Sequence, residues 1–331
     1  MRAEINRRRL LKSGIATATG ILLSAAGSRQ GWSAYPERPV RIIVPQPPAG
    51  PTDIAARFIA AELSQVLGNA VFIENKPGAG GNIGIGFAAR TEPDGYTLLV
   101  ASSTFTVNPA MYSKIPYEPL RDFIPVCEMA VAPNCVVVDP KLGISSMKEL
   151  VESVRKEPGK FNYTSPGAGT NPHLAAEMLK ASEKIDMVHV PHTGGGPALQ
   201  AILSGTVPIL FSGLPPAHPY ITSGTLKALA LLGPNRWHDL PEVPTWNEIG
   251  YLGPSFETFQ AIFAPAATPT DIIARIEAET LRILRRAEFK QKLLQAGFEV
   301  TALSGASLKA KISEELLLWR DVVTKAGISP R

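Results

Sequence analysis

Turns rich in glycine and proline recur at four places where a short apolar run is followed by a helical pattern. They lie in residues 41–53, 71–82, 161–173 and 187–197. A turn that leads directly into a helix leaves backbone N–H groups unpaired, and the positive end of the helix dipole adds to them. Such a turn can bind an anion without a basic side chain. A single turn of this kind is more simply an ordinary strand–helix connection, and it is the repetition that favours an anion site.

Hydroxyl and imidazole side chains accompany these turns. Thr52 opens the helix after the first turn, and Thr164, Ser165 and Thr170 flank the third. His192 precedes the glycines of the fourth, where a polar contact is the favoured role. Together with glycine amides, neutral donors of this kind can converge on an anionic group.

The same segments do not match other catalytic or ligand-binding patterns. The pattern G-x-G-x-x-G, counted from Gly78, fails at Ile83, and no G-x-x-x-x-G-K-[ST], G-x-S-x-G or H-E-x-x-H is present. His189 and His192 have H-x-x-H spacing without a third ligand at metal spacing, so we expect no metal and no cofactor. A hydrolase that uses Ser165 and His192 stays open, although no acid is placed to orient the histidine.

Only two cysteines occur, Cys127 and Cys135. In an oxidising compartment they could form a disulfide that closes a small loop. The alternative is that they are two small apolar residues in neighbouring strand segments.

Apolar runs and helical patterns alternate after residue 34, which predicts an α/β fold with mainly parallel sheets flanked by helices. The first three strands are predicted at residues 41–44, 71–74 and 97–101. Ser102 and Ser103 follow the third strand at its carboxyl end, where open α/β sheets bind ligands. Solvation of a surface loop is the alternative for these two hydroxyls.

Two strand-like pieces within residues 123–138 predict a crossing into a second domain. In that domain Asn171 is predicted as a helix N-cap, with Pro172 at the first helical position. The apolar segment 256–264 is predicted to return to the first domain, and a helix at 307–326 completes it. Two crossings predict a discontinuous first domain and a hinge of two strands.

The length of 331 residues predicts about two domains. The net charge of +4 comes from residues 1–34, which hold six basic residues and one acid. The rest has 27 basic and 28 acidic residues, a net charge of −1. These bases are dispersed, so no nucleic-acid partner is expected.

The first 34 residues are predicted to be an export signal, since a basic stretch precedes a weakly apolar run that is too short to span a bilayer. The stretch NRRRLLK resembles the twin-arginine pattern, with Asn6 where Ser or Thr is usual. Cleavage is predicted near Ala34, with residues 25–26 as the alternative, and the mature protein in the periplasm. The predicted domains are then 35–131 with 255–331, and 132–254.

The mature chain as a whole resembles the substrate-binding proteins of tripartite tricarboxylate transporters, the Bug family. The matching segments, which follow the family order, are RIIVPQPPAGPTD, VFIENKPGAGGNIG, PDGYTLLVASS, FNYTSPGAGT, MVHVPHTGGGPALQAILSG, KALALLG, LPEVPTWNEIG and IFAPAATP. This resemblance implies a two-lobed periplasmic binding protein fold of the second type, which closes on a small organic carboxylate. It also implies one large and one small membrane subunit as partners, and we expect the binding protein itself to be a monomer.

Carried over by resemblance, the ligand-binding role is assigned to residues of the turns and strand ends. They are Pro48, Ala49, Gly50, Thr52, Ser102, Ser103, Thr164, Ser165, Gly167, Thr170, His192 and Thr193. The chain departs from the usual family pattern at Gln46, Ala49, His192 and Ser212-Gly213, where Phe, Gly, Tyr and Asp-Asn are common. Gln46 and Ser212 are therefore candidates for specificity. The nature of the carboxylate, and a role in sensing instead of transport, stay open.

Overall fold

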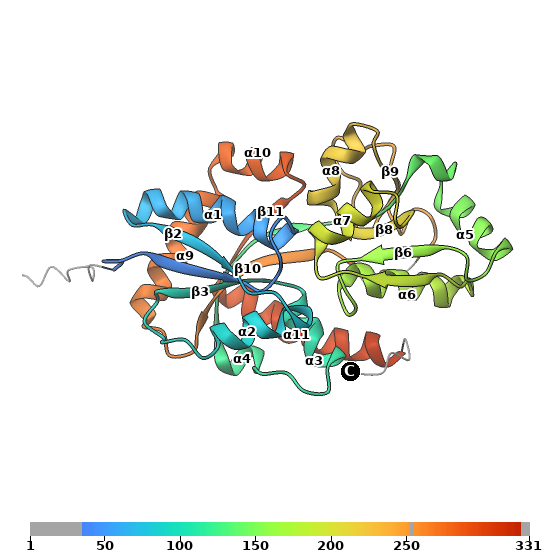
Figure 1. Ribbon diagram of the computed structural model, residues 1–331. Helices are drawn as coiled ribbons and strands as arrows, with labels where there is room; N and C mark the ends of the chain where they lie inside the picture. Colours follow the sequence, from blue (N-terminus) through green and yellow to red (C-terminus); the bar gives the residue numbers. More distant parts are fainter. Residues whose placement is uncertain (1–34, 252–254, 326–331) are drawn as a thin grey trace, which may run out of the picture. The chain divides into compact units, whose positions relative to one another are not determined.

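Two β-sheets with helices packed against them organise the chain (Figure 1). The computed structural model describes residues 35–251 and 255–325. The described residues from Arg38 onward form one unit. The predicted export signal lies outside the described residues. Within them, no helix is long and apolar enough to cross a membrane.

The first sheet has six strands in the order β11-β4-β10-β3-β1-β2, and we call it and its helices the first lobe. Its strands are β1 (Val40–Val44), β2 (Val71–Asn75), β3 (Thr97–Ser102), β4 (Phe123–Ala132), β10 (Thr258–Pro265) and β11 (Glu299–Ser304). Its helices are η1 (Ala79–Gly81), α1 (Pro51–Leu67), α2 (Asn82–Ala88), α3 (Thr104–Met111), α4 (Pro119–Asp122), α9 (Thr270–Leu284), α10 (Ala287–Gln295) and α11 (Gly305–Lys325). The neighbouring residues Ile42 and Ile43 of β1 are both completely buried, because helices cover both faces of this sheet.

The second sheet has five strands in the order β7-β6-β8-β5-β9, and with its helices it forms the second lobe. Its strands are β5 (Asn134–Val138), β6 (Asn162–Ser165), β7 (Val188–Pro191), β8 (Ile209–Gly213) and β9 (Lys227–Leu231). Its helices are η2 (Pro140–Leu142), α5 (Met147–Lys156), α6 (Asn171–Glu183), α7 (Gly195–Leu203) and α8 (Leu214–Thr222). Helices α5 and α6 cover one face, and α7 and α8 cover the other.

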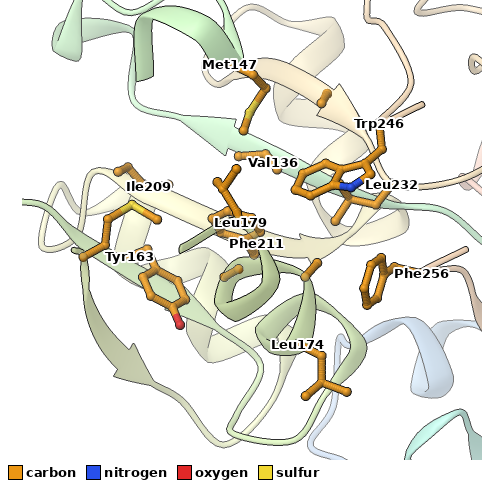
Figure 2. Packing of buried hydrophobic residues seen from close by; sticks show 14 of the residues in the cluster. Val136, Met147, Tyr163, Leu174, Leu179, Ile209, Phe211, Leu232, Trp246 and Phe256 are labelled. Carbon is orange, nitrogen blue, oxygen red and sulfur yellow. The ribbon is translucent and has the colours of Figure 1, made fainter. Parts of the chain in front are cut away.

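The core between the second sheet and helices α5 and α6 also receives side chains from the first lobe. Figure 2 shows Val136, Tyr163 and Phe211 from the sheet packed with residues of these helices. Trp319 from α11 belongs to the same cluster, and its ring centroid lies 6.2 Å from that of Phe256. Helix α11 therefore contacts the cores of both lobes.

The α/β fold predicted from the sequence is confirmed, but the sheets are mixed and not mainly parallel. Four strand pairings are parallel and five are antiparallel. The antiparallel pairings all involve β4, β5 or β10, the strands at the two crossings between the sheets. A strand that enters from the other lobe has no helical crossover to set its direction, so it is free to pair antiparallel.

The structure decides between the two alternatives for the cysteines and corrects one helix start. Cys127 and Cys135 are free, since they lie in strands of different sheets, and burial raises the pKa of the Cys135 thiol to about 12. The N-cap of α6 is Thr170 and not Asn171. Residues 246–250 form a turn that follows a bridge between Leu231 and Thr245.

Gly84 brings α2 directly against the backbone that follows β1 and β2. A Cβ atom at this position would lie 2.5 Å from the Lys76 carbonyl oxygen and 2.8 Å from the Pro45 Cα. We expect Gly84→Ala to lower the free energy of unfolding by about 1–3 kcal/mol, despite the better helix propensity of alanine. Ile83→Ala, at a side chain 56% exposed in the same helix, should change it by about 0.5 kcal/mol or less. Urea unfolding measures both, and equal stability of Gly84→Ala and the wild type would contradict this close packing.

Candidate functional site

A cavity of about 380 Å³ lies where turns from both lobes meet. The first lobe lines it with residues that follow β1, β2 and β3, and the second with residues that follow β6, β7 and β8. The carboxyl ends of strands in both sheets therefore face one space, as is usual for ligand sites in α/β proteins. Lining residues also come from the crossing strands, at Asn134 and Thr258.

The turns of the two lobes touch beside this cavity. Gly194 has a φ of 147°, and a Cβ atom there would lie 2.7 Å from the Pro47 side chain. A Cβ atom on Gly50 would lie 3.8 Å from the Gly195 nitrogen. Only glycine permits both the backbone angle at Gly194 and its close approach to Pro47.

The turn after β1 is held by the carboxylate of Asp53 in the first turn of α1. It accepts hydrogen bonds from Ala49 N (3.0 Å), Arg57 Nε (2.8 Å) and Asn75 Nδ2 (2.9 Å). Burial alone would raise the pKa of this carboxyl, but the bonds from Arg57, Asn75 and Ala49 outweigh it and hold the pKa below its ordinary value. The positive end of α1 is thus already matched by a carboxylate of the chain itself.

Hydroxyl groups after β3 form the donor group of the first lobe. Ser103 Oγ accepts from Phe259 N at 3.2 Å, which leaves its own O–H to donate. Thr104 Oγ1 lies 3.3 Å from Ser102 Oγ and accepts from Gln46 Nε2 at 3.1 Å. Of the two hydroxyl protons of Ser102 and Thr104, one can close their mutual bond, and the other remains for a ligand.

In the second lobe, contacts with strands β6 and β7 hold His192 in place. Its Nδ1 lies 2.7 Å from Thr164 Oγ1 and 3.3 Å from Val190 O. Ser165 Oγ pairs with a different histidine, His189 Nε2, at 2.7 Å. The pair Thr164–His192 and the pair Ser165–His189 lie on opposite faces of the second sheet. Thr164 is in register with Val190, and the preceding residue of β6 is in register with His189. Neighbouring residues of a strand point to opposite faces.

Helix N-termini supply the rest of the positive potential. Helices α3, α6 and α7 begin at the cavity, and none has an acidic residue in its first turn. No Asp, Glu, Lys or Arg is among the described residues that line the cavity. The site is therefore a set of neutral donors and helix dipoles, suited to a small anion.

The structure brings most of the predicted site residues to this cavity. Those that line it are Gln46, Gly50, Thr52, Ser102, Ser103, Gly167, Thr170, His192 and Thr193. Five others do not: Pro48, Ala49, Thr164, Ser165 and Ser212.

The absence of each of these five residues from the cavity lining has a physical reason. Pro48 has no N–H, and the N–H of Ala49 is donated to Asp53. Thr164 and Ser165 are completely buried strand residues that hold histidines. Ser212 is also completely buried, so the predicted roles of these side chains in ligand contact find no support in this geometry.

Several lining residues were not predicted as ligand contacts. Those outside the strand–helix turns of the second lobe include Tyr112 at the end of α3, Asn134 and Thr258 on the crossing strands, and the glycine turn 78–81. The turn 78–81 was identified as a helix start without a ligand role. Polar residues at the two crossings are the signal that could have indicated Asn134 and Thr258.

A second cavity, of about 850 Å³, lies within the second lobe between α5 and β9. Its lining includes charged residues, among them the ion pair Arg155–Glu183 at 2.8 Å. No turn of the first lobe reaches it, and β9 is an antiparallel strand. The smaller cavity between the lobes is therefore the better candidate site.

Comparison with known proteins agrees with this geometry. The family model of the tripartite tricarboxylate transporter family receptor matches residues 55–328. The chain belongs to this family. A relative within the Bug proteins is BugT of Bordetella pertussis, which is 32% identical over 93% of this chain and 96% of its own length.

Solved structures of the family match over almost their full length. The periplasmic binding protein BugD has a TM-score of 0.85 and 32% identity, over 90% of this chain and 100% of its own. A protein of R. palustris solved with adipate has a TM-score of 0.87 and 30% identity, over 90% and 100%. MatC of Rhodopseudomonas palustris, solved with malate, has a TM-score of 0.81 and 32% identity, over 87% and 100%. This chain of the receptor family therefore has the two-lobed periplasmic binding protein fold.

Asp53→Asn tests the carboxylate that holds the first turn. The new amide would place an NH2 group where Arg57 or Asn75 now donates, so we expect a loss of about 1–3 kcal/mol of unfolding free energy at pH 7. Because the folded pKa of Asp53 is lowered, the wild type has this contribution above about pH 4 and loses it as the pH falls further. Denaturant unfolding from pH 7 to pH 3 should therefore show the gap between variant and wild type shrinking.

The matched control is Asp271→Asn, at an exposed carboxylate in the first turn of α9. It should cost about 0.3–1 kcal/mol, the contribution of a helix dipole alone. An Asp53→Asn loss no greater than that of the control would show that the hydrogen bonds to Asp53 do not stabilise the turn.

Proposed function

We propose that this family member is an extracytoplasmic solute-binding protein that captures a small organic carboxylate in the inter-lobe cavity. We further propose that it is exported to the periplasm and delivers the ligand to membrane subunits of a tripartite transporter. The observation that carries the proposal is a cavity between the lobes lined by hydroxyls and helix N-termini, with no charged side chain among its described lining residues.

The donors are sufficient for useful affinity. A hydrogen bond to a charged group contributes about 1.5–3 kcal/mol, and micromolar affinity needs about 8 kcal/mol. Five or six such bonds offset the binding costs and leave that amount. The hydroxyls of residues 102–104, with amides at the starts of α6 and α7, can supply this number.

The solved relatives support a carboxylate as the ligand class. One was solved with adipate and another with malate, and both have the same fold over almost their full length. Adipate and malate both carry two carboxyl groups. A neutral, donor-lined cavity of about 380 Å³ has room for molecules of this size.

Movement of the lobes would allow the membrane subunits to distinguish the ligand-bound protein from the ligand-free protein. We propose that residues 35–131 with 255–331 and residues 132–254 move as two domains about the crossings. The contact of Gly194 with Pro47 joins turns of different lobes, so opening of the cleft must break it. A ligand that bridges both walls favours the closed form by its differential affinity.

In the proposed role the ligand is bound and released unchanged. Ser165, the nucleophile of the hydrolase alternative, is completely buried and does not line the cavity. It pairs with His189, whereas His192 pairs with Thr164. The arrangement therefore lacks an accessible hydroxyl activated by the histidine of the cavity.

A thermal-shift screen with small organic acids tests the proposal. A ligand at a hundred times its dissociation constant stabilises the folded protein by about 2.7 kcal/mol, which raises the Tm by several degrees. Ser103→Ala should weaken binding of any acid found by about tenfold or more, because it removes an O–H donor from the cavity. Calorimetry measures the affinity.

Ser145→Ala, at a hydroxyl outside the cavity, is the control and should bind as the wild type does. A broad panel of mono-, di- and tricarboxylates that leaves the Tm unchanged would refute the proposed ligand class. Unchanged affinity in Ser103→Ala would remove only that hydroxyl from the site.

A further inference from the structure

His192 differs from the other polar groups of the cavity in its response to pH. Among the described lining residues only Tyr112 and His192 carry titratable side chains. A phenol ordinarily loses its proton near pH 10, whereas an imidazole titrates between about pH 5 and pH 8. His192 therefore carries the type of side chain, among the described lining residues, that can gain a proton near neutral pH.

The surroundings of the ring decide which nitrogen carries the proton. The Val190 carbonyl oxygen, 3.3 Å from Nδ1, can only accept a hydrogen bond. The Thr164 hydroxyl, 2.7 Å from Nδ1, can accept as well. These contacts favour a proton on Nδ1, so that Nε2 has a lone pair in the neutral ring and an N–H in the protonated ring.

An anion near Nε2 would meet very different partners in these two states. A lone pair repels a carboxylate oxygen, whereas an imidazolium N–H donates a charge-assisted hydrogen bond to it. The starts of α6 and α7 lie in the same wall without an acidic residue in the first turn, which adds to the attraction for an anion.

We infer that His192 recognises a second acidic group on the ligand and binds it through Nε2–H in the imidazolium form. This inference rests on the proposed function and deepens it. The first carboxylate of the ligand would be bound by Ser102, Ser103 and Thr104, and the second by the wall of His192. A dicarboxylate then binds together with a proton, and its affinity rises as the pH falls.

Other titratable groups lie on the elements around His192. The test must distinguish their effect on ligand affinity from the effect of His192. Their side chains occupy the opposite face of the sheet or other elements. They are Tyr163 on β6, His189 on β7, and His173, Glu177 and Lys180 on α6, which form one cluster, and the pair Asp53–Arg57 on α1. Helix α7 and the turn at residues 166–170 carry none.

The experiment compares matched acids by calorimetry between pH 6 and pH 8. The probes are succinate, glutarate and adipate, with butyrate, valerate and hexanoate as monocarboxylates of the same lengths. For the wild type we expect dicarboxylate affinity to be about fivefold higher at pH 6 than at pH 8. Titration in buffers of different ionisation enthalpy should show proton uptake with dicarboxylates and none with monocarboxylates.

His192→Gln keeps a polar side chain and removes the titration. It should bind dicarboxylates with an affinity that no longer changes with pH, at or below the wild-type value at pH 8. His189→Gln and the exposed His238→Gln are matched controls that should keep the wild-type pH dependence. Thermal unfolding of each variant confirms that it is folded.

The outcomes separate this inference from the proposed function. Dicarboxylate binding that does not vary with pH in the wild type, or a pH dependence that disappears in His189→Gln and persists in His192→Gln, would overturn the role of His192 alone. Failure of every acid, mono- or dicarboxylate, to bind would overturn the proposed function together with it.

Discussion

The buried carboxylate of Asp53 determines how the rest of the cleft can work. It uses the positive end of α1, the Ala49 amide and the Arg57 guanidinium to fix the turn after β1. The longest helix that begins at the cavity is therefore unavailable as an anion site, although its N-terminus faces the right way. Donors for a ligand can come from the hydroxyls after β3 and from α6 and α7 in the other lobe. A ligand is fully bound only when both lobes contribute.

Helix α11 joins the two lobes by contacts of two different kinds. Near its start, Lys311 Nζ pairs with the completely buried Glu128 of β4 at 2.7 Å, and Thr106 Oγ1 donates to Glu315 at 2.8 Å. Burial raises the pKa of Glu315, so this end is a desolvated polar contact that tolerates little displacement. Near its other end, Trp319 packs in the apolar core of the second lobe. Apolar contacts are non-directional, so this contact constrains the relative position of the lobes less strictly than the polar ones do.

The sequence indicated the elements of this fold better than their pairing. Buried apolar runs look the same in parallel and antiparallel strands, so the direction of β4, β5 and β10 could not be read from them. The N-cap of α6 was misplaced by one residue, because Thr170 and Asn171 are both good caps and proline is tolerated in either of the first helical positions.

The candidate site was predictable where it depends on turns and not where it depends on side-chain direction. Ser103 and His192 directly follow strands, and Gly50 directly precedes α1, so the strand and helix pattern located them. Thr164 and Ser165 are still inside β6, where alternate side chains point into the helical layers, and they support histidines instead of lining the cavity. Tyr112 reaches the cavity through tertiary packing that no local pattern encodes.

The lack of Lys and Arg among its described lining residues gives the cleft a physical means of releasing its ligand. The attraction of a fixed positive charge would persist over a screening length of about 8 Å at physiological salt, and so would survive a modest opening of the lobes. Hydrogen bonds from hydroxyls and amides are lost within a fraction of that distance. Since the donors are divided between residues 102–104 and the starts of α6 and α7, separation of the lobes removes one set of donors from the anion. Affinity therefore depends on closure, as the proposed capture and release of a ligand require.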